Sequence, residues 1–151
     1  MSLKNWTPGI GYVPTYQLSG VPFVTSSFGT ELDGARTPVV RFPFVTRWVE
    51  IVNTGDSRLR VGFTANGVAG TGGSVSGSNE ERKSDHSNFF ILGTSGSASG
   101  GTVRWELRCK ELHFGLHDGP STGFTVIAGL TGIPSNEFPT LTGSQGFIGV
   151  G

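Results

Sequence analysis

The chain has 151 residues, of which 15% are charged, and a formal net charge of zero. This length suits one domain with a single core, and the balanced charge argues against nucleic acid or an anionic membrane as a partner. The 25 glycines, 8 prolines and 11 phenylalanines favour short strands and many turns over helices. We therefore expect an all-β protein.

Residues 1–20 hold a single charged side chain, Lys4, and place aromatic residues between prolines and glycines. The pattern predicts an extended N-terminal arm. Trp6, Tyr12 and Tyr16 are its large aromatic residues, and aromatic side chains are enriched in protein interfaces, so these three are candidate contacts for another subunit. The arm contains no apolar run of signal-peptide length, and we expect the protein to be assembled in a cytoplasm.

Eight runs of strand-forming residues follow, with turn residues between them. The runs are residues 21–28, 37–42, 46–53, 58–65, 87–92, 102–109, 111–117 and 123–130. Short strands at this spacing are typical of an antiparallel β-sandwich, so residues 21–130 are predicted to form one. The Asn-Thr-Gly turn at residues 53–55 predicts that the third and fourth runs pair as a hairpin.

Two of the runs alternate basic and apolar residues. The basic residues are Arg58, Arg60, Arg104 and Arg108, and the apolar residues are Leu59, Val61, Phe63, Val103, Trp105 and Leu107. Neighbouring side chains of a strand point to opposite faces, so the apolar set is predicted to share one core and the arginines to face away from it. Arginine binds carboxylates and carbonyls through a planar fork. The four arginines are therefore candidate interface residues, with a solvated surface as the alternative.

The apolar pattern changes phase after Cys109. Apolar residues occupy odd positions up to Cys109 and even positions from Leu112 onward. Because a shift of one residue turns every side chain to the other face, we predict a bulge or bend near Lys110 and Glu111. The chain could pass from one sheet to another there. Cys109 is the only cysteine and is predicted to be a small buried residue.

Several segments carry parts of enzyme or metal signatures, but none is complete. The glycine-rich residues 66–78 lack the Gly-Lys-Ser/Thr ending of a phosphate-binding loop, so they are predicted to form an ordinary solvated loop. Residues 119–123 have the G-x-S-x-G spacing of hydrolases, yet no histidine or aspartate follows Ser121, and a tight turn is the prediction. On these grounds we expect no enzymatic activity and no cofactor.

A metal site is also not expected. Cys109, His113 and His117 lie at four-residue intervals, which along a strand separates neighbours by roughly 13 Å, too far to share one ion. Glu106 and Glu111 could be proposed as a catalytic pair, but Glu106 is predicted to form ion pairs with the arginines beside it.

Residues 131–151 lose the strand pattern and are predicted to form an extended C-terminal arm. Glycines and prolines separate its apolar residues, so the arm can neither form a helix nor bury much surface on itself. It would gain most by docking on a neighbouring subunit, with Phe138, Phe147 and Ile148 filling pockets.

Two segments, residues 42–68 and 89–114, resemble small β-sandwich structural proteins of tailed-phage virions. They share an aromatic strand, an Asn-Thr-Gly turn, an L-x-V-x-F strand, a Gly/Ser loop and a closing W-x-L strand, and together they cover about half of the chain. The resemblance implies an accessory capsid, decoration or fibre-base role in a symmetric oligomer, with no catalytic residues to transfer.

The expectation is therefore a jelly-roll-like antiparallel sandwich with extended N- and C-terminal arms. It would act as a non-enzymatic structural protein of a virion, assembled in the host cytoplasm, with copies of itself, expected as a homotrimer, and other virion proteins as partners. The alternative is a carbohydrate-binding sandwich that uses an exposed tryptophan, Trp6, Trp48 or Trp105, as a stacking platform. An enzyme is the third possibility, which would need a pocket holding a hydrogen-bonded acid and base.

Overall fold

A computed structural model describes residues 20–27, 32, 37–69, 88–94, 96, 100–141 and 149–150. The strands are β1 (Val21–Ser26), β2 (Val39–Arg41), β3 (Phe44–Asn53), β4 (Leu59–Gly62), β5 (Phe89–Leu92), β6 (Thr102–Trp105), β7 (Glu111–Leu116) and β8 (Phe124–Pro134). The helices are α2 (Ala65–Ala69) and the 3-10 helix η2 (Ser135–Glu137). Each of the eight predicted runs overlaps one of these strands, although β3 begins before its run and β8 ends after its run. The solvated loop predicted at residues 66–78 is wrong for residues 66–69, which lie in α2 with Gly67 and Val68 buried, and residues 70–78 lie outside the described residues.

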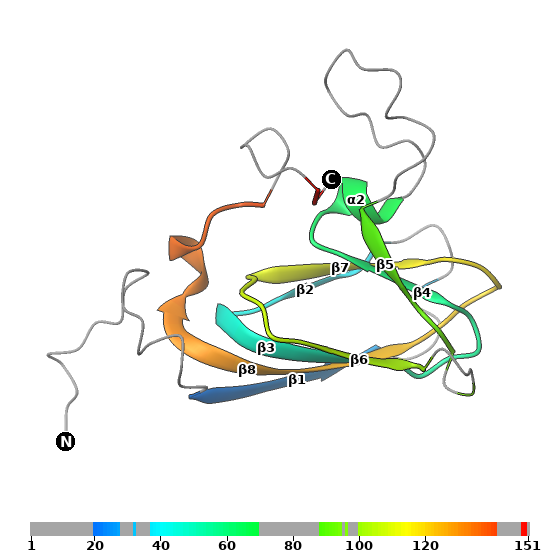
Figure 1. The fold of residues 1–151 in the computed structure, drawn as a ribbon, viewed down its shortest axis with the longest axis horizontal. Helices are drawn as coiled ribbons and strands as arrows, with labels where there is room; N and C mark the ends of the chain where they lie inside the picture. The colour runs from blue at the N-terminus through cyan, green and yellow to red at the C-terminus, as the bar shows by residue number, and fades with distance from the viewer. Residues whose placement is uncertain are drawn as a thin grey trace, which may run out of the picture.

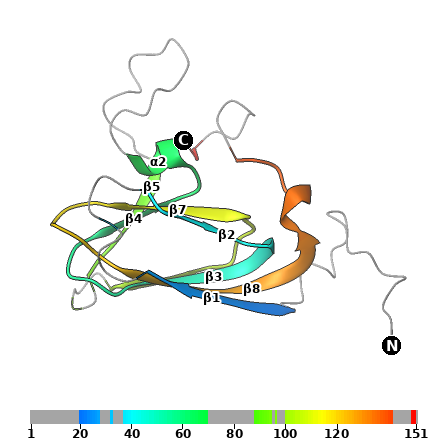
Figure 2. The same cartoon turned by 180° about the vertical axis from the view of Figure 1, so that it is seen from behind.

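The strands form two stacked antiparallel sheets, which Figures 1 and 2 show from opposite sides. The first sheet has the order β1-β8-β3-β6 and the second has the order β2-β7-β4-β5. The first strand thus pairs with the last, the second with the seventh, the third with the sixth and the fourth with the fifth. One long hairpin folded over itself gives this order, which is that of a jelly roll. The predicted antiparallel β-sandwich is confirmed.

The core lies between the inner faces of the two sheets. Phe114 of β7 stacks on Phe124 of β8, with ring centroids 4.0 Å apart and planes 9° from parallel, so this pair joins one sheet to the other. The six apolar residues predicted to share a core do so. Leu59 and Val61 are fully buried, whereas the other four, Phe63, Val103, Trp105 and Leu107, are partly buried and pack against the same cluster.

The hairpin predicted at residues 53–55 is wrong, because β3 belongs to the first sheet and β4 to the second. The chain crosses between sheets at this turn, and the buried side chain of Asn53 holds the crossing. Its Nδ2 donates to Ser57 O at 2.8 Å and to Gly93 O at 2.9 Å, and its Oδ1 accepts from Gly55 N at 3.0 Å and from Thr122 Oγ1 at 2.7 Å. A buried polar side chain with every hydrogen bond satisfied can fix one chain path.

The change of sheet predicted near residues 110 and 111 is confirmed. β6 lies in the first sheet and ends at Trp105, and β7 begins at Glu111 in the second sheet. Thr46 of β3 fastens the connection, because its Oγ1 donates to Leu107 O at 2.9 Å and accepts from Cys109 N at 2.9 Å. Cys109 is buried at this point, as predicted.

The strand prediction for residues 63–65 is wrong, because β4 ends at Gly62, residues 63 and 64 form a bend, and helix α2 begins at Ala65. The reason is a contact distant in sequence. Val68 packs where Gly62 and Gly115 leave space on the outer face of the second sheet, and a Cβ added at Gly115 would lie 2.6 Å from Val68 Cγ1. Arg60 of β4 then donates to Ala69 O at 3.1 Å, which places a cation at the C-terminal end of this helix.

Replacing Gly115 with alanine is expected to lower the free energy of unfolding by about 1–3 kcal/mol, since the added methyl group overlaps Val68. Urea unfolding followed by tryptophan fluorescence measures the change. The Val68→Ala background is the matched control, because it removes the overlapping methyl groups and should make Gly115→Ala cost markedly less. An equal cost in both backgrounds would show that Val68 is not what Gly115 accommodates.

The last strand runs to Pro134, so the domain boundary predicted after Leu130 falls inside it. Thr131 Oγ1 donates to Val45 O at 2.8 Å, and Ile133 is buried. Residues 131–134 therefore belong to the sandwich, because β8 continues along the bulged start of β3.

The described residues beyond β8 also contact their own chain. Lys110 Nζ donates to Phe138 O at 3.2 Å and to Thr140 Oγ1 at 2.9 Å. Near the C-terminus, Thr64 Oγ1 donates to Val150 O at 2.6 Å, and Figure 1 shows the C-terminus beside α2. These parts of the predicted C-terminal arm lie on the same molecule. Docking of the arm on a neighbouring subunit stays a prediction.

Candidate assembly surface

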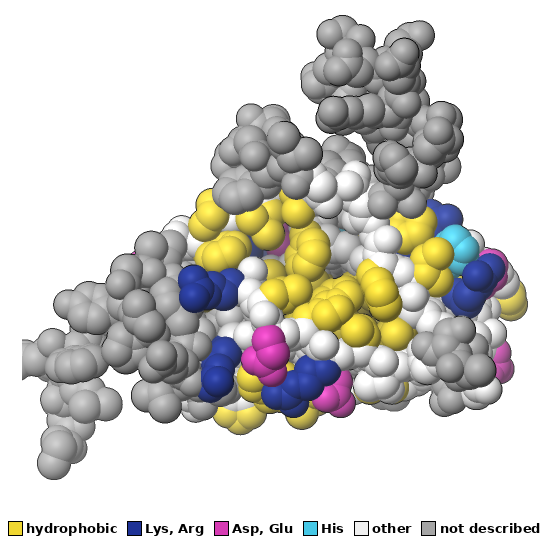
Figure 3. Space-filling view, viewed as in Figure 1, with side chains coloured by type: hydrophobic (Ala, Val, Ile, Leu, Met, Phe, Trp, Pro, Cys, Tyr) yellow, Lys and Arg dark blue, Asp and Glu magenta, His cyan; other side chains and the backbone are white. Residues whose placement is uncertain are grey.

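Apolar side chains are left partly exposed on the side of the sandwich where β5 and β6 end their sheets. Phe90 of β5 and Trp105 of β6 meet there edge to face, with ring centroids 5.5 Å apart, and Phe63 lies 6.1 Å from Trp105. Phe90 is 46% exposed. We call Phe63, Phe90, Val103, Trp105 and Leu107 the β5–β6 opening, and Figure 3 shows a hydrophobic area on this side of the molecule.

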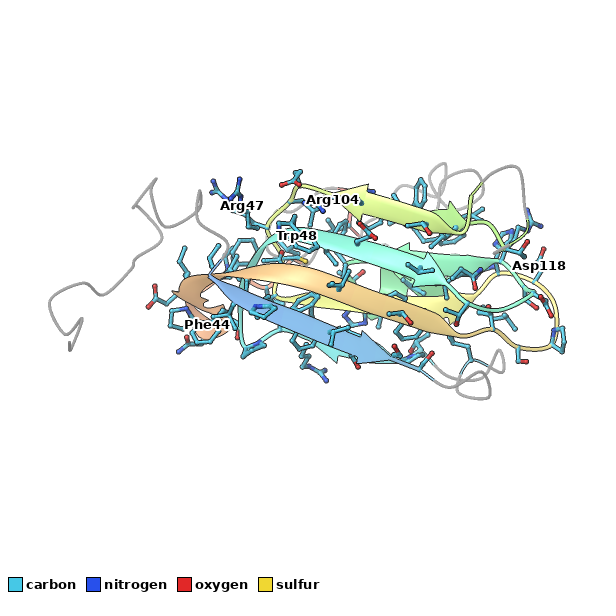
Figure 4. The ribbon with its side chains drawn as sticks, turned by 90° about the horizontal axis from the view of Figure 1, so that it is seen from below. Phe44, Arg47, Trp48, Arg104 and Asp118 are labelled. Atoms are coloured by element: carbon cyan, nitrogen blue, oxygen red, sulfur yellow. The ribbon has the colours of Figure 1, made fainter. Side chains whose placement is uncertain are left out.

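Charged side chains of both signs border the β5–β6 opening on the outer face of the first sheet. Arg104 Nη2 lies 3.1 Å from Glu106 Oε1, and Arg104 Nη1 lies 3.9 Å from Glu50 Oε2. The guanidinium of Arg104 also lies over the ring of Trp48 at 4.1 Å, as Figure 4 shows from below. Arg108 is exposed on the same stretch of chain. An apolar centre beside a polar, arginine-containing rim is typical of protein interfaces.

The other two predicted arginines lie elsewhere, on β4 and on the residue before it. Arg58 Nε donates to Asp118 Oδ2 at 2.6 Å, and this hydrogen bond holds the pKa of Asp118 below its usual value. Arg60 lies over the Phe89 ring at 4.6 Å and its Nε donates to His117 Nδ1 at 3.2 Å. Burial, followed by the charges of the two arginines, lowers the pKa of His117. Arg58 and Arg60 are thus engaged with their own chain.

The remaining candidate residues are only partly described. Phe138 is half-buried, and its carbonyl oxygen accepts the hydrogen bond from Lys110. Five candidates, Trp6, Tyr12, Tyr16, Phe147 and Ile148, lie outside the described residues. Phe90, in contrast, is an interface candidate that the sequence reading missed. Phe90 lies opposite the buried Val61 and faces inward, and its exposure comes from the position of β5 at the edge of its sheet, which the alternation of a single strand does not record.

An open cleft of about 630 Å³ lies at one end of the sandwich between the β3–β4 and β7–β8 loops, lined by residues 54–57 and 118–123. The G-x-S-x-G segment lies in the β7–β8 loop, in the wall of the cleft, with Gly119 at φ 78°, a conformation that glycine adopts most readily. Within the described ranges, no group of three or more His, Cys, Asp or Glu side chains is placed to hold a metal ion. The cleft carries polar groups but no assembled acid and base.

Stability should fall between pH 9 and pH 12 because of Cys109. Burial raises the pKa of its thiol from 9.0 to about 12, against the opposing effect of the Thr46 hydrogen bond. Between pH 9 and pH 12 the thiol is deprotonated in the unfolded chain but stays protonated in the folded chain. Its contribution to the free energy of unfolding is therefore fully present below pH 9 and decreases as the pH rises toward 12. Urea unfolding across this range measures the decline, and Cys109→Ala should show a shallower one. If the free energy of unfolding of wild type and of Cys109→Ala depends on pH in the same way, Cys109 is not the cause of the decline.

Among the described residues, no helix is long and apolar enough to cross a membrane. No protein-family model, curated protein sequence or solved structure matches the chain.

Proposed function

We propose that the chain is a non-enzymatic structural protein of a tailed-phage virion, either a capsid decoration or accessory subunit or a component of a fibre base. It assembles in the host cytoplasm with copies of itself, as a homotrimer, and with other virion proteins, through the faces of its sandwich and its extended arms. The observation that carries this proposal is the β5–β6 opening. Partly exposed aromatic side chains on two edge strands, each paired on one side only among the described residues, next to charges of both signs, favour burial against another protein.

Three further observations support a structural role. The jelly-roll order of the sheets is one that viral capsid domains use, although lectins and enzymes use it as well, so the fold alone does not decide. The two segments that resemble virion sandwich proteins, residues 42–68 and 89–114, contain β3 to β6 and most of β7 and thus include the β5–β6 opening. Because the formal net charge is zero, copies of the chain do not repel one another electrostatically at long range.

The carbohydrate alternative needs a tryptophan ring with a free face. Trp48 and Trp105 are both half-buried. The guanidinium of Arg104 lies over Trp48, and the edge-to-face contact with Phe90 engages Trp105. These contacts favour packing roles for both rings over sugar stacking. Trp6, the third candidate, lies outside the described residues.

The test of the virion role is mass spectrometry of particles purified from a phage whose genome encodes this sequence. A structural protein is expected at a constant copy number relative to the major capsid protein through successive density-gradient steps. Gradual loss of the chain during these steps, or its absence from the particles, would contradict the proposal. The carbohydrate alternative is checked separately, since Trp48→Ala would abolish glycan retention only in a sugar-binding protein.

A further inference from the structure

Residues 102–108 read Thr-Val-Arg-Trp-Glu-Leu-Arg and are nearly symmetric in chemistry about Trp105. Arg104 and Glu106, on either side of Trp105, have opposite charges, and the next residues outward, Val103 and Leu107, are both apolar. If two identical copies of this stretch pair antiparallel with Trp105 opposite Trp105, each Arg104 faces a Glu106. Each Val103 then faces a Leu107. Opposite charges and apolar pairs placed directly across two strands stabilise their pairing.

The backbone of β6 is oriented for such a contact. Among the described strands β6 has one neighbour, β3, and the bond from Asn53 N to Gly101 O sets the register in which Trp105 is opposite Val49. In an antiparallel ladder alternate residues bond to the same neighbour, so the N–H and C=O groups of Thr102 and Arg104 point away from β3. Pairing centred on Trp105 matches Arg104 with Glu106 and Thr102 with Arg108. Beyond β6, the bond from Thr46 Oγ1 to Leu107 O places the Leu107 carbonyl on the β3 side, in phase with the odd-numbered residues of β6.

The side chains of this stretch also lie on the faces that the pairing needs. Val103 and Trp105 are opposite the buried Ile51 and Val49 and therefore face inward. Arg104 and Glu106 are exposed on the outer face. The alternation continues past the end of β6, with Leu107 half-buried and Arg108 exposed. A second copy would therefore extend the first sheet and close the β5–β6 opening of both molecules with the same set of apolar residues.

We propose that two copies of the chain associate through antiparallel pairing of residues 102–108, about a two-fold axis at Trp105. This inference rests on the proposed function only in requiring self-association. The contact is isologous, so each copy contributes the same residues, and two reciprocal Arg104–Glu106 pairs form. By itself this contact yields a dimer, and it is distinct from the three-fold contact of the proposed homotrimer; the two together give an assembly with an even number of chains.

Charge reversal at Arg104 and Glu106 tests the pairing in the full-length chain. Sedimentation velocity over a wide concentration range compares wild type, Arg104→Glu, Glu106→Arg and the double variant. Each single variant places like charges opposite each other twice per dimer and is expected to weaken self-association by about tenfold or more. The double variant restores both pairs and should recover near wild-type association. Arg41→Glu, a charge reversal at an exposed residue of β2, is the matched control and should leave the self-association unchanged.

Circular dichroism melting curves confirm that each variant is folded before it is compared. A wild-type chain that is monomeric at all concentrations overturns the two-fold contact. An association that both single variants leave unchanged also overturns it, as does a double variant that stays as weak as the singles. In these last two cases the chain still self-associates, so the result contradicts the pairing of residues 102–108 but not the proposed structural role. Loss of the chain from purified particles, in contrast, removes the virion role but not the contact.

Discussion

Replacing Phe114 with alanine should lower the free energy of unfolding by about 3–5 kcal/mol, one of the largest effects of any single substitution in this chain. The ring is fully buried and stacks on Phe124, so its removal opens a cavity between the two sheets. The surrounding strands can collapse only partly into that space, because each is held by hydrogen bonds to its own sheet. The loss should therefore approach the full cost of the cavity.

Urea unfolding of wild type and Phe114→Ala measures this loss, and Ile127→Ala is the control. Ile127 is also a large apolar residue, but it lies on the outer face of the first sheet and is 39% exposed, so its truncation should cost less than about 1 kcal/mol. A Phe114→Ala cost no greater than that of Ile127→Ala would show that the two sheets do not pack around this ring.

Replacing Asn53 with alanine should cost about 3–4 kcal/mol, because several buried groups lose their partner at once. The substitution leaves the hydroxyl of Thr122 and the carbonyl oxygens of Ser57 and Gly93 without the bonds that Asn53 provides. An unsatisfied buried polar group costs about 1–3 kcal/mol, and partial relaxation or entry of water reduces the sum.

Thermal and urea unfolding of Asn53→Ala test this expectation, with Thr122→Val as the graded control. The valine keeps the shape of the threonine side chain and removes only the 2.7 Å bond to Asn53 Oδ1, so about 1–2 kcal/mol should be lost. If Asn53→Ala costs no more than Thr122→Val, the crossing from β3 to β4 does not depend on the amide of Asn53.

The sequence was sufficient to predict that each of the eight strands exists, though not where each one ends, because alternation is a local property of each stretch. The odd positions of residues 59–63 and of 103–109 do face the core, and the change of phase after Cys109 does mark a change of sheet. Both signals depend only on the direction in which neighbouring side chains point. They identify which residues face inward but not which strands are neighbours.

The errors arise where distant residues decide the local structure. The turn at residues 53–55 reverses the chain in either a hairpin or a crossing, and the choice depends on Gly93 and Thr122, which bind Asn53. The sequence did contain a clue. Asn53 is in phase with Val49 and Ile51, which face inward, so its side chain points into the core and not toward solvent as in an exposed hairpin turn. Helix α2 likewise depends on the space that Gly115 leaves for Val68, a contact that no periodicity records.

The candidate surface was predicted only in part for the same reason. Alternation showed that Arg104 and Arg108 face away from the core, but it treated Arg58 and Arg60 in the same way. Whether an arginine is available to a partner depends on its neighbours across strands. Arg58 binds Asp118 and Arg60 binds the end of α2, and Arg104 also pairs with Glu106 and Glu50 of its own chain, but only Arg104 does so beside the β5–β6 opening. The exposure of Phe90 follows from the position of β5 at the edge of its sheet.

Sedimentation equilibrium of the purified full-length chain tests most directly whether this protein is a self-assembling structural subunit. We expect a concentration-dependent approach to a defined multiple of the chain mass, with Arg104→Glu shifted toward the single chain in the same experiment. The measurement reports mass without reference to shape. A wild-type protein that has the mass of one chain throughout the accessible concentration range would contradict assembly through the β5–β6 opening.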